Sequence, residues 1–551
     1  MRRAHLAAAG ALAVALLSAS AAIAKPPDVD SSKLEAAVTV AGIVEHQQAL
    51  QNIATLNGGT RATTTPGYTA SVAYVRDTME RAGYNVSISN FDMPDWHESA
   101  PPVLQQLTPT AKTYVPGSAA DDNSPAVDFI AFEFSPTADV ANAPVVPTND
   151  ILIPSPGGST SGCEKSDYPD ATKGAISLIQ RGTCSFVQKL ELAEAAGAAG
   201  VILFNEGDTA GRRNALFRSG PNDLGIPSVL SSFAVGEELY NAFRNHLNPR
   251  VHLGTNGVTV PHFYPQVIAE TRAGDPNHVV LAGAHLDSVP SGPGINDDGS
   301  GSAWQLEVGE QIAKVGTPPR QKIRLMWFGG EEQGLVGSQY YAAHLSQADV
   351  DKIDVMIDTD MIASPNYVRF VYDGDGNELG SAGPTGSGTV EEVFKRYFQE
   401  RGMATLPQAF DGRSDYVGFI NRGIPAGGIF AGAEAPKTAA QVAVFGGVAG
   451  EQYDPCYHEA CDNITTVTGQ PPASTMNSFA TDPALAQMQA SSLNGNALKS
   501  LDEMSDALTH EIWYFARVKD ALAPRTLTAS RAKPAESHSF TFNGHRDART
   551  R

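Results

Sequence analysis

Four short apolar runs in the second half of the chain set the strongest limits on its fold. They span residues 278–287, 322–332, 353–362 and 424–433, and patterns with helical spacing, such as SAWQLEVGEQIAKVG at 302–316, lie between them. Nearly continuous apolar runs that alternate with amphipathic helices are typical of parallel strands buried on both faces. We therefore expect an α/β fold with a mixed, mostly parallel central sheet flanked by helices.

Three of these runs end in residues that could bind a cation. The first ends in His285 and Asp287, the second ends in Glu331 and Glu332, and the third carries Asp358 and Asp360 near its end. Open α/β sheets place their sites at the carboxyl ends of the strands, so these side chains should lie close together. Clustered carboxylates would repel one another unless a cation or hydrogen bonds compensated. The pattern therefore predicts a metal site.

The loop GINDDGSG at 294–301 follows the first of these strands and carries Asp297. It lacks the lysine of a phosphate-binding G-x-x-x-x-G-K-[ST] loop, and its two carboxylates would repel phosphate. It also lacks the alternating acids and final glutamate of an EF-hand; DGDGNE at 373–378 matches that pattern better, but its twelfth position is Pro384, so a polar turn is expected there. A catalytic metal site fits the loop best.

A pair of zinc ions suits this set of side chains. Zinc prefers imidazole and carboxylate ligands, and a catalytic site leaves a position open for water. Two zinc ions about 3.5–4 Å apart commonly share a bridging carboxylate and a water in aminopeptidases. The residues at the strand ends supply one histidine, so a second is needed downstream. The candidate is His458 in DPCYHEACD, where Cys456 and Cys461 flank it and a disulfide between them would hold it in place.

Five motifs in order along the chain resemble those of the dinuclear-zinc aminopeptidases, which include secreted bacterial leucyl-type aminopeptidases and vacuolar aminopeptidase Y. The motifs are GAHLDSVPSGPGINDDGSGSA, FGGEEQGLVGSQYY, DTDMIASPN, GRSDYVGFINRGIP and DPCYHEACD. The resemblance implies the zinc exopeptidase fold, two Zn²⁺ ions per subunit, and removal of N-terminal residues, preferably apolar ones, from peptides or proteins with a free N-terminus. It also implies that the peptide bond between Asp297 and Asp298 is cis.

The resemblance assigns a role to each matching residue. One zinc ion would be bound by His285 and Asp360, the other by Glu332 and His458, and Asp297 would bridge them. The other three roles concern the reaction: Glu331 as the general base for a zinc-bridging water, Asp287 as the residue that orients His285, and Tyr457 as a residue that polarises the scissile carbonyl.

Arg413 has two interpretations. In the related enzymes a residue at this position helps to bind product, but it could instead be only an ion-pair partner of Asp415. Two alternative functions also stay open: an exopeptidase like glutamate carboxypeptidase II, which needs a basic pocket, and a non-catalytic receptor on the same fold, which would have lost its metal ligands. All five ligands and the base are present in this chain.

The first 24 residues have the layout of a secretory signal peptide. Arg2 and Arg3 precede an apolar run, and Ala22-Ile23-Ala24 offers a cleavage site. We therefore expect export to the periplasm or the medium, where two local disulfides, Cys163–Cys184 and Cys456–Cys461, are the simplest account of the four cysteines. No later segment is apolar enough to span a membrane, and the net charge of −21 argues against nucleic acid as a partner. We expect a monomer.

A β-rich unit interrupts the catalytic domain. Its sequence GCEKSDYPDATKGAISLIQRGTCSFVQKLELAEAAGAAGVILFNE resembles a protease-associated (PA) domain, in which the pair at 163 and 184 matches a common disulfide. The expected organisation is a signal peptide at 1–24, a catalytic domain at 35–98 and 258–525, a PA domain at 99–257 and a flexible or processed tail at 526–551.

Overall fold

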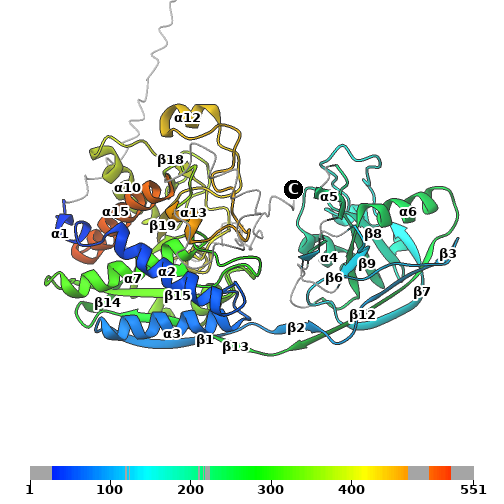
Figure 1. The fold of residues 1–551 in the computed structure, drawn as a ribbon, viewed down its shortest axis with the longest axis horizontal. Helices are drawn as coiled ribbons and strands as arrows, with labels where there is room; N and C mark the ends of the chain where they lie inside the picture. The colour runs from blue at the N-terminus through cyan, green and yellow to red at the C-terminus, as the bar shows by residue number, and fades with distance from the viewer. Residues whose placement is uncertain are drawn as a thin grey trace, which may run out of the picture.

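The computed structural model describes residues 28–522, except for 118–120, 123–124, 209–210, 215, 218–223 and 470–495. The expected signal peptide and basic tail lie outside the described residues. Figure 1 shows two lobes, one built around an eight-stranded sheet and the other around a nine-stranded sheet. Among the helices in the described ranges, none is long and apolar enough to cross a bilayer.

The eight-stranded sheet forms the centre of the first lobe. In order across the sheet, its strands are β1 (Asn85–Asp92), β13 (Phe263–Glu270), β15 (Gln321–Phe328), β14 (Asp275–His285), β16 (Ile353–Thr359), β19 (Ala426–Phe430), β17 (Phe370–Tyr372) and β18 (Leu406–Gln408). The four central strands, from β15 to β19, are parallel, whereas β1 and β13 run antiparallel to their neighbours. The predicted mixed α/β sheet is confirmed, and its parallel part contains the strands that end in the acids and His285.

Helices cover both faces of this sheet. On β14, Val280 and Ala282 belong to one hydrophobic core and Val279 and Leu281 to another, because alternate residues of a strand point to opposite faces. The first core includes α2 (Val40–Leu56), α3 (Pro66–Arg81), α7 (Gly299–Lys314), α10 (Ser387–Glu400) and α15 (Asn496–Arg517). The second includes α8 (Val336–His344), α9 (Gln347–Val350) and α11 (Tyr416–Asn421). Shorter helices are α1 (Ser32–Glu35), α12 (Ala439–Phe445) and α13 (Ile464–Thr468).

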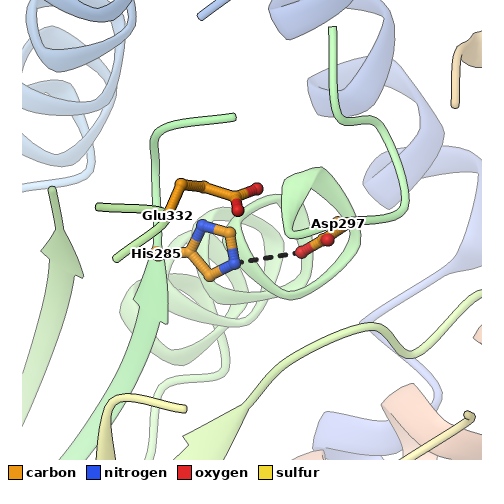
Figure 2. A group of neighbouring side chains, drawn as sticks. All are labelled: His285, Asp297 and Glu332. Carbon is orange, nitrogen blue, oxygen red and sulfur yellow. Dashed lines mark hydrogen bonds and ion pairs between the residues drawn. The ribbon is translucent and has the colours of Figure 1, made fainter. Parts of the chain in front are cut away.

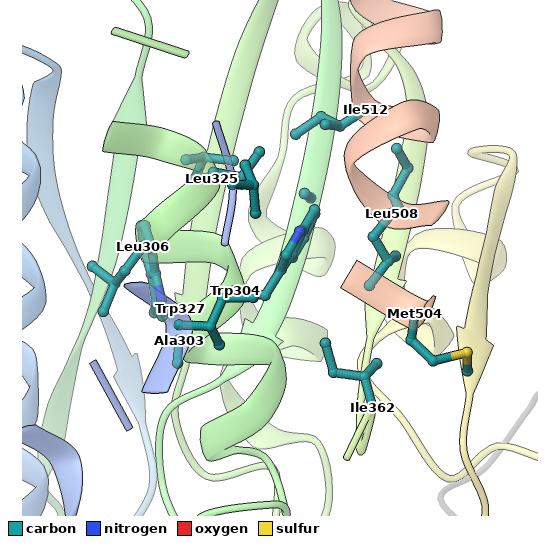
Figure 3. Packing of buried hydrophobic residues seen from close by; sticks show 14 of the residues in the cluster. Ala303, Trp304, Leu306, Leu325, Trp327, Ile362, Met504, Leu508 and Ile512 are labelled. Atoms are coloured by element: carbon teal, nitrogen blue, oxygen red, sulfur yellow. The ribbon is translucent and has the colours of Figure 1, made fainter. Parts of the chain in front are cut away.

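The core behind the strand ends is closely packed. Trp304 of α7, Trp327 of β15 and Leu508 of α15 are all fully buried there, as Figure 3 shows. The Trp304 indole N–H donates to the hydroxyl of Thr509 (3.1 Å), so the polar atom of this ring is also satisfied. The helix α15 is not among the elements that the apolar runs predict. It completes this core and packs against β14 and β15. This packing matters because functional side chains must be held in place by their neighbours.

The second lobe is the β-rich insert. Its sheet contains, in order, β4 (Lys112–Thr113), β3 (Val103–Thr108), β12 (Arg250–Val260), β7 (Thr137–Pro147), β8 (Ile176–Gln180), β9 (Gly200–Phe204), β11 (Ser228–Ser231) and β6 (Phe129–Ala131), while β2 (Asp95–Glu98) pairs with β12. The main helices are α4 (Phe186–Ala195) and α6 (Phe233–Arg244). The predicted Cys163–Cys184 disulfide is present.

Candidate active site

The carboxyl ends of three adjacent parallel strands bring the predicted site residues together. His285 is the last residue of β14, Glu331 and Glu332 follow β15, and Asp360 follows β16. Asp297 comes from the connection between β14 and α7, immediately before the N-cap residue of that helix. All of these side chains are buried, as expected for a site at the end of a sheet covered on both faces.

His285 lies at the centre of one half of the site. Its Nε2 is 3.1 Å from Asp297 Oδ1 and 3.9 Å from Asp360 Oδ1, as Figure 2 shows in part. On the other side of the ring, Nδ1 lies 3.2 Å from the backbone oxygen of Asp287, to which an Nδ1–H would donate. That hydrogen bond favours the tautomer in which Nε2 carries a lone pair, and Nε2 is the atom that faces the carboxylates.

Asp287 contacts the backbone of both glutamates as well as the histidine. Its carboxylate oxygens accept the backbone N–H groups of Glu331 (3.3 Å) and Glu332 (3.4 Å), and its Oδ1 is 3.8 Å from His285 Nδ1. It therefore ties the end of β14 to the end of β15. The sequence pattern gave no signal for this link between Asp287 and the two glutamates, because it depends on the register of neighbouring strands.

His458 forms the other half of the site. Its Nε2 is 3.2 Å from Asp297 Oδ2 and 3.2 Å from Glu332 Oε2. The residue has a positive φ of 60° in the short loop closed by the Cys456–Cys461 disulfide, which confirms that predicted pair. The ring of Tyr457 stacks on the imidazole with 3.8 Å between centroids. The disulfide and the stacked ring limit the positions that His458 can adopt.

The distances fit a pair of zinc ions. Two ligand atoms that each lie 2.0–2.1 Å from one tetrahedral zinc ion are about 3.3 Å apart. The separations between Asp297 and the two histidines, 3.1 and 3.2 Å, agree with this value. The two histidines approach different oxygens of Asp297, which is the arrangement that a bridging carboxylate needs. His285, Asp297 and Glu332 also form a group whose ligand atoms lie within 4.8 Å of one another.

The electrostatics of the site call for a cation. Burial would lower the pKa of His458, but the charges of Glu332 and Asp297 raise it to about 10. Burial raises the pKa of Asp360 to about 6 and also raises the pKa of Glu331, to which the charge of Glu332 adds. These shifts arise because several acids share a volume that water does not reach. A divalent cation would favour their charged forms.

Asp298, which follows the proposed bridging residue Asp297, bonds to the backbone of two other segments. Its Oδ1 accepts the backbone N–H groups of Gly301 (2.9 Å) and Met361 (3.1 Å), so it caps α7 and joins that helix to the end of β16. It lies in a second group of possible ligands with His285 and Asp360, within 4.8 Å. The peptide bond between Asp297 and Asp298 is cis, which confirms the expectation.

Arg413 and Tyr457 lie together at the edge of the site. The Arg413 guanidinium donates to both oxygens of Glu434 (3.0 and 3.2 Å) and to the Tyr457 hydroxyl (3.1 Å). Its carboxylate partner is thus Glu434, and the interpretation of Arg413 as a partner of Asp415 is wrong. Tyr457 also belongs to a small apolar cluster with Met361, Ala433 and Phe430. Sequence reasoning missed Glu434, which no motif identifies.

Comparisons with known proteins match both lobes. The profile of Peptidase family M28 matches residues 266–478, and that of the PA domain matches residues 141–239. An aminopeptidase of Pseudomonas aeruginosa is 43% identical over 427 residues, which cover 77% of this chain and 76% of that protein. A leucine aminopeptidase 2 of Trichophyton equinum is 39% identical over 325 residues, which cover 58% of this chain and 64% of that protein.

Solved structures share the fold at low sequence identity. An aminopeptidase from Aneurinibacillus sp. strain AM-1 is 21% identical with a TM-score of 0.61, and the match covers 89% of this chain and 97% of that one. A zinc aminopeptidase from Bacillus subtilis is 20% identical with a TM-score of 0.57, covering 88% and 96% of the two chains.

Proposed function

Because the chain belongs to peptidase family M28, we propose that it is an exported, monomeric aminopeptidase that uses two zinc ions to remove N-terminal residues, preferably apolar ones, from peptides and proteins. The observation that carries the proposal is the position of Asp297, whose two oxygens face the Nε2 atoms of His285 and His458. The two disulfides support export, because such bonds persist in oxidising compartments.

The residues present would hold zinc at two neighbouring positions. His285 and Asp360 would bind one ion, Glu332 and His458 the other, and Asp297 both. Zinc bound in this way lowers the pKa of a coordinated water and polarises a carbonyl oxygen.

Glu331 is proposed as the general base. It is fully buried and follows β15 after two glycines, and its Oε2 lies 3.8 Å from His285 Nε2, so its carboxylate reaches the centre of the ligand set. Its neighbour Glu332 contacts His458 instead. Since adjacent residues point in different directions, one glutamate can bind metal while the other takes a proton from water and passes it to the leaving amine.

The edge of the site suits an apolar N-terminal residue with a free amine. The buried carboxylates provide acceptors for the ammonium group of a free N-terminus. This contact would explain why the enzyme removes only N-terminal residues. Met361, Ala433 and the partly buried Phe430 form an apolar cluster with the Tyr457 ring, and an aliphatic side chain of the substrate is proposed to pack beside it. The Tyr457 hydroxyl, held by Arg413, is proposed to donate to the carbonyl oxygen of the scissile bond.

Two pairs of substrates test the proposal. The purified zinc-loaded protein should hydrolyse leucine p-nitroanilide and should not hydrolyse its N-acetyl derivative, because acetylation removes the amine that the carboxylates recognise. Peptides that end in glutamate should lose residues from the N-terminus only. Release of C-terminal glutamate from an N-blocked peptide would instead support the carboxypeptidase-like alternative. Absence of both activities in a protein that binds zinc would contradict the proposal.

A further inference from the structure

The connection between β14 and α7 carries two residues of the site but contains no helix or strand of its own. It spans residues 286–298 and is buried except near residues 289–291. A buried segment without regular structure must satisfy its backbone groups through other partners. Two charged residues from distant parts of the chain provide partners for six of these groups.

Arg61 holds the carbonyl groups of this connection. It lies between α2 and α3, is fully buried, and donates from Nε to Pro293 O (2.8 Å), from one terminal nitrogen to Leu286 O, and from the other to Gly294 O (2.6 Å). Its own backbone N–H donates to the Ser288 hydroxyl (2.9 Å). A planar guanidinium can reach three carbonyl oxygens that lie around its edge, whereas a lysine ammonium carries its three donors on one nitrogen and cannot span them in the same way.

Asp462 holds the amide groups of the same connection. It is almost fully buried (2% exposed), and its two carboxylate oxygens accept the backbone N–H groups of Asn296 (2.7 Å) and Asp297 (2.9 Å). Its backbone oxygen accepts the N–H of Ile295 (3.2 Å). Because Asp462 directly follows the disulfide loop that carries His458, these bonds join the two segments that supply the facing ligands.

Arg61 donates to one connection and Asp462 accepts from it. Both bond to its backbone rather than to each other. Burial opposes the charged form of each residue, so the fold bears a cost to place them there. Asp287 and Asp462 favour the charged form of Arg61 and offset part of the lowering of its pKa by burial.

We propose that Arg61 and Asp462 are positioning residues, which we call the loop clamp, that hold residues 286–298 so that Asp297 faces both His285 and His458. The proposal rests on the proposed zinc site, and it concerns the zinc-free protein as well as the loaded one. Residues that orient metal ligands commonly change metal affinity about 10- to 100-fold when replaced.

Two conservative variants test the loop clamp. Arg61→Lys keeps the charge but loses the fork of donors, and Asp462→Asn keeps the shape but places an amide NH₂ against a backbone N–H. The matched controls are Arg181→Lys and Asp373→Asn. Arg181 is a fully buried arginine of the other lobe that donates to Asn205 (3.1 Å), and Asp373 is a fully buried aspartate that accepts the N–H groups of Glu378 and Leu379.

Zinc affinity, measured by competition with a chelator, is the first readout. Each clamp variant should bind zinc at least about tenfold more weakly than the wild type, and each control should stay within about twofold. The double variant should lose less than the product of the two single losses, because both residues act on one connection. Folded clamp variants with wild-type zinc affinity would overturn the proposal.

Amide hydrogen exchange in the zinc-free protein is the second readout, and it separates this proposal from the proposed function. Exchange of residues 286–298 should become faster in both clamp variants and stay unchanged in the controls, whether or not the protein is an aminopeptidase. Unchanged protection of that segment would refute the loop clamp. A wild type that binds no zinc would instead refute the proposed function.

Discussion

Replacing Glu331 by glutamine tests the assignment of the general base. The glutamine side chain has the same shape as glutamate and leaves the backbone N–H contact with Asp287 intact, but it cannot accept a proton. Zinc should stay bound, because Glu332 rather than Glu331 contacts His458. A positioned base contributes about 10²- to 10⁴-fold to rate. At 1.36 kcal/mol for each factor of ten, this loss corresponds to about 2.7–5.4 kcal/mol of transition-state stabilisation.

The assay is the initial rate of leucine p-nitroanilide hydrolysis, with zinc content measured on the same samples by mass spectrometry. We expect kcat of Glu331→Gln to fall by at least about 10²-fold while zinc content stays at the wild-type level. Glu307→Gln is a matched control, since Glu307 is a buried glutamate of α7 whose contacts are Thr39 and Gln311, and its kcat should be unchanged. Wild-type turnover by a zinc-loaded Glu331→Gln variant would refute the assignment.

Three further predictions follow from single contacts. Replacing both cysteines of the 456–461 pair by serine should weaken zinc binding, measured by chelator competition, while the same change in the 163–184 pair should not. Tyr457→Phe should lower kcat on leucine p-nitroanilide by about 10²-fold without loss of zinc; an unchanged kcat would show that the hydroxyl has no role. Burial, with help from the charge of Asp502, raises the pKa of Asp506 to about 7. Its ionisation therefore lowers stability as the pH rises from about 4 to 7, so Asp506→Asn should raise Tm at pH 8 and not at pH 4, whereas equal shifts would contradict this sign.

The fold and the meeting of the candidate ligands could be predicted because both depend on local patterns. The apolar runs mark the parallel strands, and the register of a parallel sheet brings their carboxyl ends together, so residues next to those ends had to meet. The structure brings His285, Glu332 and Asp360 together in this way. His458 lies on no strand, and only the motif around it identified this residue.

The positions of Arg61, Asp462 and Glu434 could not be predicted because their contacts join segments far apart in the chain. Arg61 lies more than two hundred residues before the carbonyls that it holds, and no pattern in the chain around it signals that role. Asp462 bonds to backbone N–H groups, which every residue but proline carries, so the sequence does not specify which groups it meets. Arg413 pairs with Glu434 and not with Asp415, which one of its two interpretations named, because the fold brings Glu434 to the guanidinium although Asp415 is nearer in the sequence.

Anomalous diffraction at the zinc edge from crystals of the purified protein tests the central claim most directly. The account predicts two zinc peaks about 3.5–4 Å apart. One should contact His285 and Asp360, the other should contact Glu332 and His458, and Asp297 should contact both. A single peak, or peaks bound by other residues, would contradict the proposal that Asp297 bridges two catalytic zinc ions.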